Sequence, residues 1–390
     1  MGNLQTYLDN KTTAIRNKYN VPAMAAVLVN STTTVTSVKG VRKTSVAASD
    51  PSNTSQKTDY FNVGSVSKPI TGYLLAALVQ KNIMSWATKL RDVFPEFTSP
   101  AFRKKTNLTT NFLDVTAEQL MAHTSGIFNQ WDSSLGQLRS DPPRVLEVYV
   151  GGDPGRFIEW ENDASNMYRR YLYTILAMQL DPIFPTGTAS GYGGAPMITA
   201  AMAERLTGKS YELLVHDHIA AGGIDFKLGA LSSKSTLDGT WQHSLDSASN
   251  TFVPNDGAQE NLYNFNSHAP AGGVRCTVAG MGAFIRANFI GMDYFPGVVN
   301  HANLTLYQQQ LFSNSARGGF YMGKMKVKNV NKDYLTHNGD NGVSRAEMNV
   351  FHKDNFGYAA MTNSSSTAST NAVNEMLGEL KTMYENWDTI

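Results

Sequence analysis

The sequence is short of cysteine, of long apolar runs and of excess charge, and each shortage excludes a class of protein. Cys276 is the one cysteine among 390 residues, so the chain forms no internal disulfide and no cysteine-based metal site. The longest apolar run, GYLLAALV at 72–79, is far shorter than a membrane span. The formal net charge is only +1 and the basic residues are scattered, which argues against a nucleic-acid or anionic-membrane surface.

What remains is an ordinary globular composition, with 42% apolar and 17% charged residues. We expect a soluble protein with no cofactor, no metal, no nucleic-acid partner and no membrane span. His216 and His218 look like a metal pair, but two residues apart on a helix they point in different directions. The compartment stays open between the cytoplasm and, if a leader is absent from this sequence, the periplasm or the exterior. The oligomeric state stays open as well.

Apolar spacing predicts strands near both ends of the chain and helices between them. The expected strands are 21–30, 33–41, 334–344, 346–354 and 356–364, and the clearest expected helices are 4–20, 68–82, 116–126, 168–180, 196–219 and 371–387. We therefore predict a mixed α/β (α+β) fold with a central antiparallel sheet, built from both chain ends and flanked by helices. Residues 1–80 and 261–390 would form this sheet domain, and 81–260 a mainly helical domain.

The segment FNVGSVSKPIT, 61–71, holds the one S-x-x-K pattern of the chain, Ser65 and Lys68. On a helix these residues share a face one turn apart, so the amine can reach the hydroxyl. Serine needs a base beside it to act as a nucleophile, and desolvation by the apolar helix that follows favours the neutral amine. The alternative is a plain helix start, with Ser65 as the N-cap and Lys68 in a solvated first turn.

Two further polar residues lie in glycine-rich surroundings. Tyr192 precedes a long expected helix, where a nearby cation would let a tyrosine act as an acid or a base. His337 and Gly339 face the same way on an expected strand, and the missing side chain lets a ligand or another backbone come close. Taken alone, each is more simply explained as structural: Tyr192 as an aromatic anchor for its loop and His337 as one histidine among eight.

In combination and order, these segments resemble the serine β-lactamase and penicillin-binding-protein superfamily. Within it the chain resembles the class C β-lactamase-like group, which includes family VIII carboxylesterases, D-aminopeptidases and DD-peptidases. The matching segments are FNVGSVSKPIT, TAEQLMAHTSGI, PTGTASGY…AERLTGKSYELL, PAGGVRCTVAGMGAFI, HNG and the last strands and helix. The resemblance implies a β-lactamase/transpeptidase-like fold with the active site between the sheet domain and the helical domain.

The resemblance also implies a role for each site residue. Ser65 would be the acylated nucleophile, and Lys68 and Tyr192 would handle its proton; which of the two is the base stays open. Backbone N–H groups would form an oxyanion hole, and the opposite wall would come from the H-N-G motif. The implied oxyanion-hole and substrate-binding residues are Ser65, His337, Gly339 and Asp340.

Two departures from the family pattern bear on the substrate. The His337 motif replaces the K-T-G of class C β-lactamases, which removes a positive charge that would meet a β-lactam carboxylate. The Tyr192 motif has Gly194 where Y-x-N has an asparagine, so a side chain that binds amides is missing. We therefore predict a carboxylesterase that acts on small or short-chain esters through an acyl-enzyme.

The alternatives are a D-aminopeptidase or DD-peptidase-like amide hydrolase or an acyltransferase, either of them with weak β-lactamase activity, or a non-enzymatic protein that kept the fold. In every enzymatic case the partner is a small-molecule ester or amide. The segment 129–165, which begins Asn129-Gln130-Trp131, is expected from its position to shape the pocket.

Overall fold

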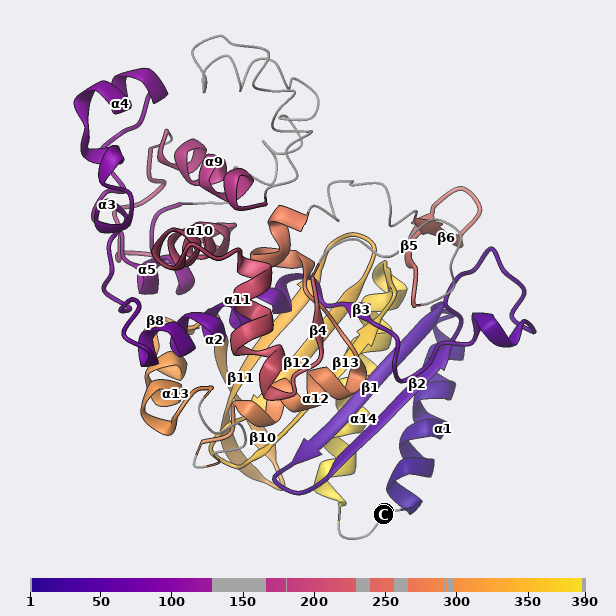
Figure 1. Ribbon diagram of the computed structural model, residues 1–390. Coiled ribbons are helices and arrows are strands. Elements are labelled where there is room, and N and C mark those ends of the chain that lie inside the picture. The colour runs from indigo at the N-terminus through magenta and orange to yellow at the C-terminus, as the bar shows by residue number, and fades with distance from the viewer. Residues whose placement is uncertain are drawn as a thin grey trace. The chain divides into compact units, whose positions relative to one another are not determined.

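The structure is a computed structural model, and it describes residues 2–127, 166–179, 181–228, 239–255, 266–290, 292 and 298–387 (Figure 1). The segment 129–165, expected to shape the pocket, lies outside the described residues. The chain divides into a sheet unit, Met1–Ser67 with Ile219–His301 and Tyr321–Ile390, and a helical unit, Lys68–His218 with Ala302–Phe320. Among the described residues, no helix is both long and apolar enough to cross a membrane.

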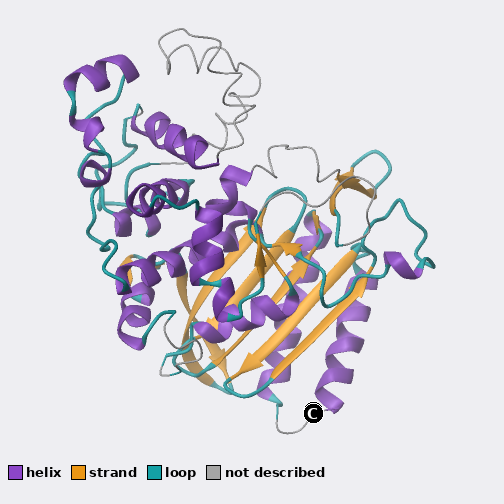
Figure 2. Ribbon diagram, in the orientation of Figure 1, coloured by secondary structure: helices purple, strands orange, loops and turns teal. Residues whose placement is uncertain are grey.

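Strands from both ends of the chain pair in one antiparallel sheet in the sheet unit (Figure 2). Their order is β2-β1-β13-β12-β11-β10. The bounds are β1 Ala23–Asn30, β2 Thr34–Gly40, β10 Tyr321–Val327, β11 Val330–Asp340, β12 Arg345–Phe351 and β13 Phe356–Thr362. The pairing of β1 with β13, which sets Ala26 opposite Ala360, joins the N-terminal to the C-terminal strands. The predicted mixed α/β fold with a sheet from both chain ends is confirmed.

Helices cover both faces of this sheet (Figure 1). On one face lie α1, Gly2–Lys18, and α14, Thr367–Glu385, whose buried side chains pack with alternate residues of the strands. Leu4, Leu8 and Ile15 recur at helical spacing and are buried, which is why α1 forms and lies flat on the sheet. On the other face lies α12, Val278–Ala287.

The strand register decides which face carries the candidate site. Gly339 lies opposite Ala346, Ala346 opposite Met361, and Met361 opposite Ala25. Residues in one such row point to the same side, and Val27, two residues after Ala25, faces α12. Gly339 therefore faces the α12 side of the sheet.

Two small sheets belong to the described part of the sheet unit. One has the order β3-β7-β4, with β3 Phe61–Asn62, β7 Arg275–Cys276 and β4 Phe226–Lys227. The other has the order β14-β5-β6, with β14 Ser364–Ser365, β5 Gln242–Asp246 and β6 Thr251–Asn255. Because β3 leads directly into the S-x-x-K segment, its pairing with β7 anchors the start of that segment.

The helical unit contains the mostly buried helix α2 and several shorter helices. Its helices are α2 Ser67–Gln80, α3 Leu90–Val93, α4 Pro100–Thr106, α5 Ala117–Met121, α9 Asn166–Met178, α10 Ala195–Thr207, α11 Tyr211–His218 and α13 His301–Gln308. A hairpin of β8, Gln310–Phe312, and β9, Ser315–Ala316, follows α13. Thr116, the first residue of the expected helix 116–126, caps α5 in a capping box with Gln119.

Two predicted helices are wrong at their ends. The helix expected over 196–219 is two helices, because Gly208 adopts φ +68° and ends α10 before α11 begins. The helix expected over 116–126 stops at Met121, and His123 takes a left-handed φ of +61°. Gly126, the last residue of the expected helix, therefore lies outside α5 and has a positive φ of +82°.

Candidate active site

Ser65 lies where a short strand passes into a long buried helix. The 3-10 turn Gly64–Val66 contains it, and α2 follows without a break from Ser67. Ser67 Oγ donates to Gly64 O at 2.6 Å and accepts from Val274 N at 2.9 Å. These bonds give Ser67 a structural role and tie the turn to the residues that precede α12. Lys68 comes next, as the second residue of α2, and only 4% of it is exposed.

The backbone of β11 lies directly against the Ser65 turn. A Cβ atom at Gly339 would lie 1.9 Å from Val63 O and 2.8 Å from Ser65 N. A Cβ atom at Gly64, whose φ is +53°, would lie 2.8 Å from Asp340 N. Neither position has space for a side chain. The sequence predicts that either a ligand or another backbone comes close to Gly339, and the structure shows the backbone of the Ser65 turn there. The backbone nitrogens of Ser65 and Asp340 both lie next to the two glycines, Gly64 and Gly339.

The side chains of His337 and Asp340 point to opposite faces of β11. His337 shares the face of Gly339, is 1% exposed, and its ring centroid lies 5.6 Å from that of Tyr321. The carboxylate of Asp340 accepts a hydrogen bond from Ser365 Oγ at 2.7 Å. Asp340 therefore presents its backbone to the Ser65 turn, while its carboxylate bonds elsewhere.

Lys68 and Tyr192 are in contact within the helical unit. Lys68 Nζ lies 4.4 Å from the centroid of the Tyr192 ring, which is within cation–π range. The ring of His123 packs on Tyr192, with centroids 4.9 Å apart. The amine of the candidate S-x-x-K pair therefore lies over the face of the Tyr192 phenol ring.

Hydrogen bonds connect the loop that carries Tyr192 to residues 123–126, the H-T-S-G segment. The N–H of Gly191 donates to His123 O, and the N–H of Gly187 donates to Thr124 O, each at 2.8 Å. These bonds run between backbone atoms, so they fix the path of the loop whatever its side chains. The H-T-S-G segment therefore positions Tyr192 both through the His123 ring and through its carbonyl groups.

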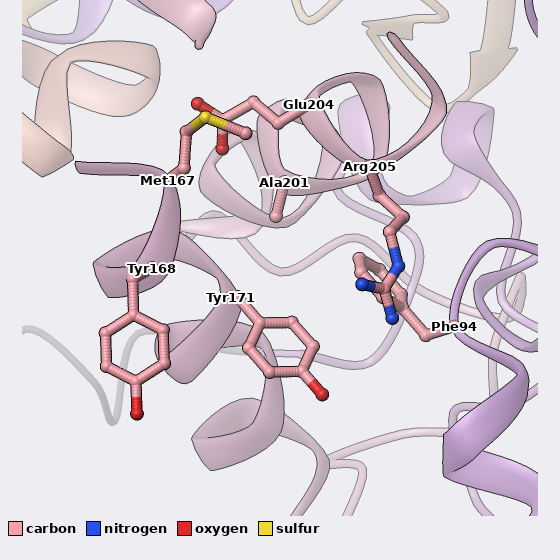
Figure 3. Close-up of a pocket in the computed structure, with 7 residues that line it drawn as sticks. All are labelled: Phe94, Met167, Tyr168, Tyr171, Ala201, Glu204 and Arg205. Atoms are coloured by element: carbon pink, nitrogen blue, oxygen red, sulfur yellow. The ribbon is translucent and has the colours of Figure 1, made fainter. Parts of the chain in front are cut away.

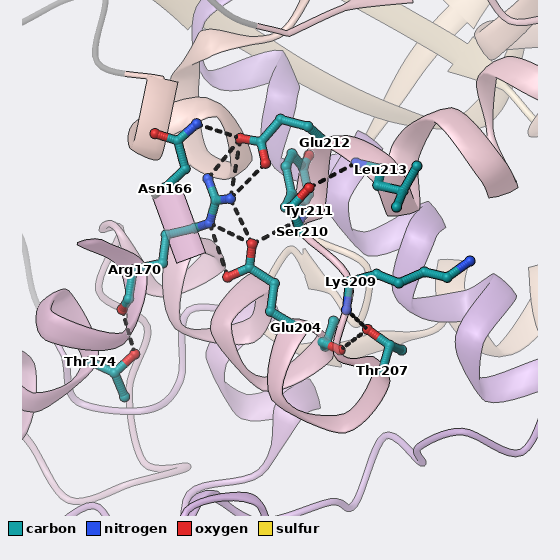
Figure 4. Close-up of polar contacts among 11 residues, drawn as sticks. Asn166, Arg170, Thr174, Glu204, Thr207, Lys209, Ser210, Tyr211, Glu212 and Leu213 are labelled. Carbon is teal, nitrogen blue, oxygen red and sulfur yellow. Dashed lines mark hydrogen bonds and ion pairs between the residues drawn. The ribbon is translucent and has the colours of Figure 1, made fainter. Parts of the chain in front are cut away.

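A buried ion-pair network braces the helices around this loop (Figure 4). Arg170 on α9 has a fully buried side chain and binds Glu204 on α10 at 2.6 Å and Glu212 on α11 at 2.9 Å. Tyr211, beside Glu212, shares a 2.8 Å hydrogen bond with Thr71 of α2. The network therefore links α9, α10 and α11 to the helix that carries the candidate base.

A separate cavity of about 400 Å³ lies in the helical unit (Figure 3). Its lining residues are Phe94, Met167, Tyr168, Tyr171, Ala201, Glu204 and Arg205. It contains none of the predicted site residues, and the guanidinium of Arg205 is already paired with Glu96 and packed over Phe94. This cavity is therefore not the candidate acyl site.

Two other kinds of site find no support in the described part of the chain. No group of three or more histidine, cysteine, aspartate and glutamate residues is placed there to hold a metal ion. Cys276 is fully buried in β7, and burial raises the pKa of its thiol well above the usual value. A thiol held in this neutral form is a poor nucleophile.

The fold and the family together define a serine hydrolase of the β-lactamase and penicillin-binding-protein superfamily. The chain belongs to the Beta-lactamase family, whose model matches residues 8–381. The predicted family and enzyme class are thereby confirmed. A search of curated protein sequences found no significant match.

Several solved structures share the fold over nearly the whole chain. A D-alanine carboxypeptidase AmpC from Burkholderia cenocepacia matches with a TM-score of 0.67 and 16% identity, over 97% of this chain and 99% of that one. A D-stereospecific amidohydrolase from Streptomyces sp. matches with a TM-score of 0.65 and 18% identity, over 96% and 98%. SurE matches with a TM-score of 0.73 and 13% identity, over 97% of this chain and 76% of SurE. At these identities the likeness shows the fold alone.

Some contacts of the candidate site had no counterpart in the sequence reasoning. His123 belongs to the matching segment TAEQLMAHTSGI, but nothing in the neighbouring sequence indicates a contact with Tyr192. Tyr173, which lies against Gly194, carried no signal at all. Both contacts join segments far apart in the chain, so only the folded structure could reveal them.

Proposed function

We propose that this chain forms an acyl-enzyme on Ser65, with Lys68 and Tyr192 as the proton-transferring pair. The observation that carries the proposal is the 4.4 Å contact between Lys68 Nζ and the Tyr192 ring. That contact lies at the start of the helix into which the Ser65 turn runs. A buried amine in contact with a partly buried phenol would supply the proton acceptor that an unactivated serine hydroxyl lacks. The placement of this site between the two predicted domains stays a prediction.

In the proposed mechanism Ser65 Oγ attacks the substrate carbonyl carbon and gives its proton to the Lys68–Tyr192 pair. The pair then protonates the leaving nitrogen or oxygen as its bond to carbon breaks, which leaves the acyl group on Ser65. A water molecule gives a proton to the same pair and attacks the ester, and Ser65 recovers its proton as the acid departs. The N–H groups of Ser65 and Asp340 would stabilise the oxyanion, a contribution of about 3 kcal/mol per donor in other enzymes.

As substrates we propose amides and esters of D-amino acids. The support is that structures of this fold include a D-alanine carboxypeptidase, a D-stereospecific amidohydrolase and SurE with D-Leu. A second candidate is the carboxylesterase predicted from the sequence, which is favoured by the absence of a side-chain amide at Gly194. The histidine in the H-N-G motif makes a β-lactam the least favoured of the three.

A matched substrate panel tests the proposal. D-alanine p-nitroanilide, its L-isomer, p-nitrophenyl butyrate and a chromogenic cephalosporin would be assayed side by side, with intact-mass detection of an adduct on Ser65. We expect a burst of product, a D-over-L preference, and loss of both the adduct and turnover in Ser65→Ala. Ser249→Ala is the control, since it removes an exposed serine hydroxyl between β5 and β6 that bonds only to its own turn and leaves the Ser65 turn unchanged. Full activity in Ser65→Ala would refute the assignment, and turnover of the butyrate ester alone would favour the esterase.

A further inference from the structure

Asp340 carries a negative charge at the end of the strand that lies against the Ser65 turn. A Cβ atom at Gly64 would lie 2.8 Å from Asp340 N, so the backbone of Asp340 is in close contact with this turn. The oxyanion of the proposed acylation step would develop beside the same backbone N–H group. Like charges repel, so an Asp340 carboxylate turned toward the Ser65 turn would raise the energy of that oxyanion. The proposed reaction therefore depends on where this carboxylate is held.

Polar groups hold the Asp340 carboxylate away from the Ser65 turn. The Ser365 hydroxyl donates to this carboxylate, with Oγ 2.7 and 2.8 Å from its two oxygens. The N–H of Gly342 donates to Oδ1 at 2.8 Å, and the guanidinium of Arg345 lies 3.9 Å from Oδ2. Because side chains alternate along a strand, the carboxylate lies on the face of β11 that is turned away from the Ser65 turn.

The small sheet β14-β5-β6 fixes the position of Ser365. Ser365 lies in β14, which pairs in parallel with β5. The N–H of His243 on β5 donates to Val343 O at 3.2 Å, and Val343 lies in the turn that follows Asp340. Strand β5 therefore supports both the serine that donates the hydrogen bond and the turn next to the residue that accepts it.

We propose that Ser365 is a positioning residue for the oxyanion of acylation. Its hydroxyl fixes Asp340 so that the backbone N–H faces the Ser65 turn and the carboxylate stays on the opposite face of β11. The proposal rests on the proposed function, because it needs an oxyanion to form as Ser65 Oγ adds to a carbonyl group. The oxyanion exists only during bond making and breaking, so the role affects the acylation rate and the binding of transition-state mimics, and not the binding of the substrate.

A substitution that removes only the hydroxyl tests this role. In Ser365→Ala the acylation rate constant with p-nitrophenyl butyrate is expected to fall about tenfold, as for one lost hydrogen bond to a charged group. The affinity for propylboronic acid, which forms an anionic tetrahedral adduct on a serine and matches the butyryl chain, should fall by a similar factor. The dissociation constant of the ester before acylation should change by less than about twofold. Acylation at the wild-type rate, or a loss confined to ester binding, would overturn the proposal.

A double-mutant cycle tests whether Ser365 acts through the Asp340 carboxylate. Asp340→Asn keeps an acceptor oxygen at this position and removes the negative charge. Ser365→Ala should therefore slow acylation by less than about threefold in the Asp340→Asn background, against about tenfold in the wild-type background. Equal losses in the two backgrounds would overturn the proposal. Ser365→Thr keeps the hydroxyl and should recover most of the wild-type rate, and a threonine variant as slow as the alanine variant would contradict the role of the hydroxyl.

Ser249→Ala is the matched control, because Ser249 Oγ also donates to a carboxylate, that of Asp246, at 2.7 Å. This pair lies at the turn between β5 and β6. Its loss should leave both the acylation rate and the boronic acid affinity unchanged. A fall equal to that in Ser365→Ala would show a general loosening of the small sheet and would overturn the specific role.

The failure of this role and the failure of the proposed function give different results. If the wild-type chain forms no adduct on Ser65 with either the ester or the boronic acid, the proposed function is wrong and the role of Ser365 is wrong with it. If the wild type acylates and Ser365→Ala acylates equally fast, only the role of Ser365 is wrong.

Discussion

Gly339→Ala is expected to disturb the position of Ser65 without touching its chemistry. The new methyl group would lie 1.9 Å from Val63 O and 2.8 Å from Ser65 N, where about 3.4 Å is an ordinary contact. Gly339 has no left-handed φ, so alanine brings no backbone strain and the whole effect is steric. β11 is paired with β10 and β12 along its length, which holds the strand in place. The turn that contains Ser65 is therefore the part that moves, by roughly 1 Å or more.

A displacement of this size has a calculable consequence for acylation. A 1 Å misplacement in an active site costs about 100-fold in rate, which corresponds to about 2.7 kcal/mol of activation free energy. Overpacking of a closed backbone contact also lowers the free energy of unfolding, by about 1–3 kcal/mol. We therefore expect Gly339→Ala to fold and to acylate about 100 times more slowly than the wild type.

Pre-steady-state kinetics with p-nitrophenyl butyrate measures the acylation rate, and urea unfolding measures the stability. Gly378→Ala is the matched control, because Gly378 is exposed on α14 and a Cβ atom there would meet nothing within 4 Å. It should keep the acylation rate and gain up to about 1 kcal/mol from helix propensity. If Gly339→Ala acylated at the wild-type rate with unchanged stability, the contact between β11 and the Ser65 turn would be refuted.

Two further predictions concern buried polar groups. Arg170→Met should lower the free energy of unfolding by about 3–5 kcal/mol in urea denaturation, since it leaves the Glu204 carboxylate buried and uncompensated. Lys11→Met, which removes a partly exposed ion pair with Glu379, should change the free energy of unfolding by less than about 1 kcal/mol. If the two substitutions lowered the free energy of unfolding equally, the expected difference between the buried and the exposed ion pair would be wrong. Burial lowers the pKa values of His243 and His352 to about 4. Between pH 6.5 and 4 the unfolded chain therefore binds protons at these histidines that the folded chain does not bind. The free energy of unfolding should fall by roughly 2–3 kcal/mol per histidine by pH 4.5. A flat urea midpoint from pH 7 to 4.5 would refute this.

The sequence predicted those strands and helices in which the buried apolar residues form a clear pattern within the element itself. β1 is buried at every residue but the last, and α14 repeats buried residues at helical spacing. β10, Tyr321–Val327, was missed because six of its seven residues are only partly buried or exposed, and it contains a glycine and two lysines. It is a strand because β11 pairs with it, and that pairing is a tertiary effect that local propensity does not encode.

The candidate site was predictable to the extent that its chemistry lies in short segments. Ser65 and Lys68 are three residues apart, so helical geometry alone relates them. The contact of Lys68 with Tyr192 joins residues more than a hundred positions apart, and only the order of family motifs suggested it. The left-handed turn at His123 was not predicted, because a positive φ is uncommon in any residue other than glycine, even though histidine adopts it more often than most. At His123, hydrogen bonds from the loop that carries Tyr192, such as the one from the N–H of Gly191 to His123 O, hold the backbone in its left-handed conformation.

Gly194 shows how a correct observation led to too strong a conclusion. From the sequence, glycine in place of asparagine meant a lost polar group, and the loss favoured esters over amides. That inference assumed that the space left by the side chain stays empty. In the structure the space is filled by Tyr173 Oη, 2.1 Å from where a Cβ atom would stand. Glycine at position 194 therefore does not by itself decide between ester and amide substrates, and the matched substrate panel has to decide between them.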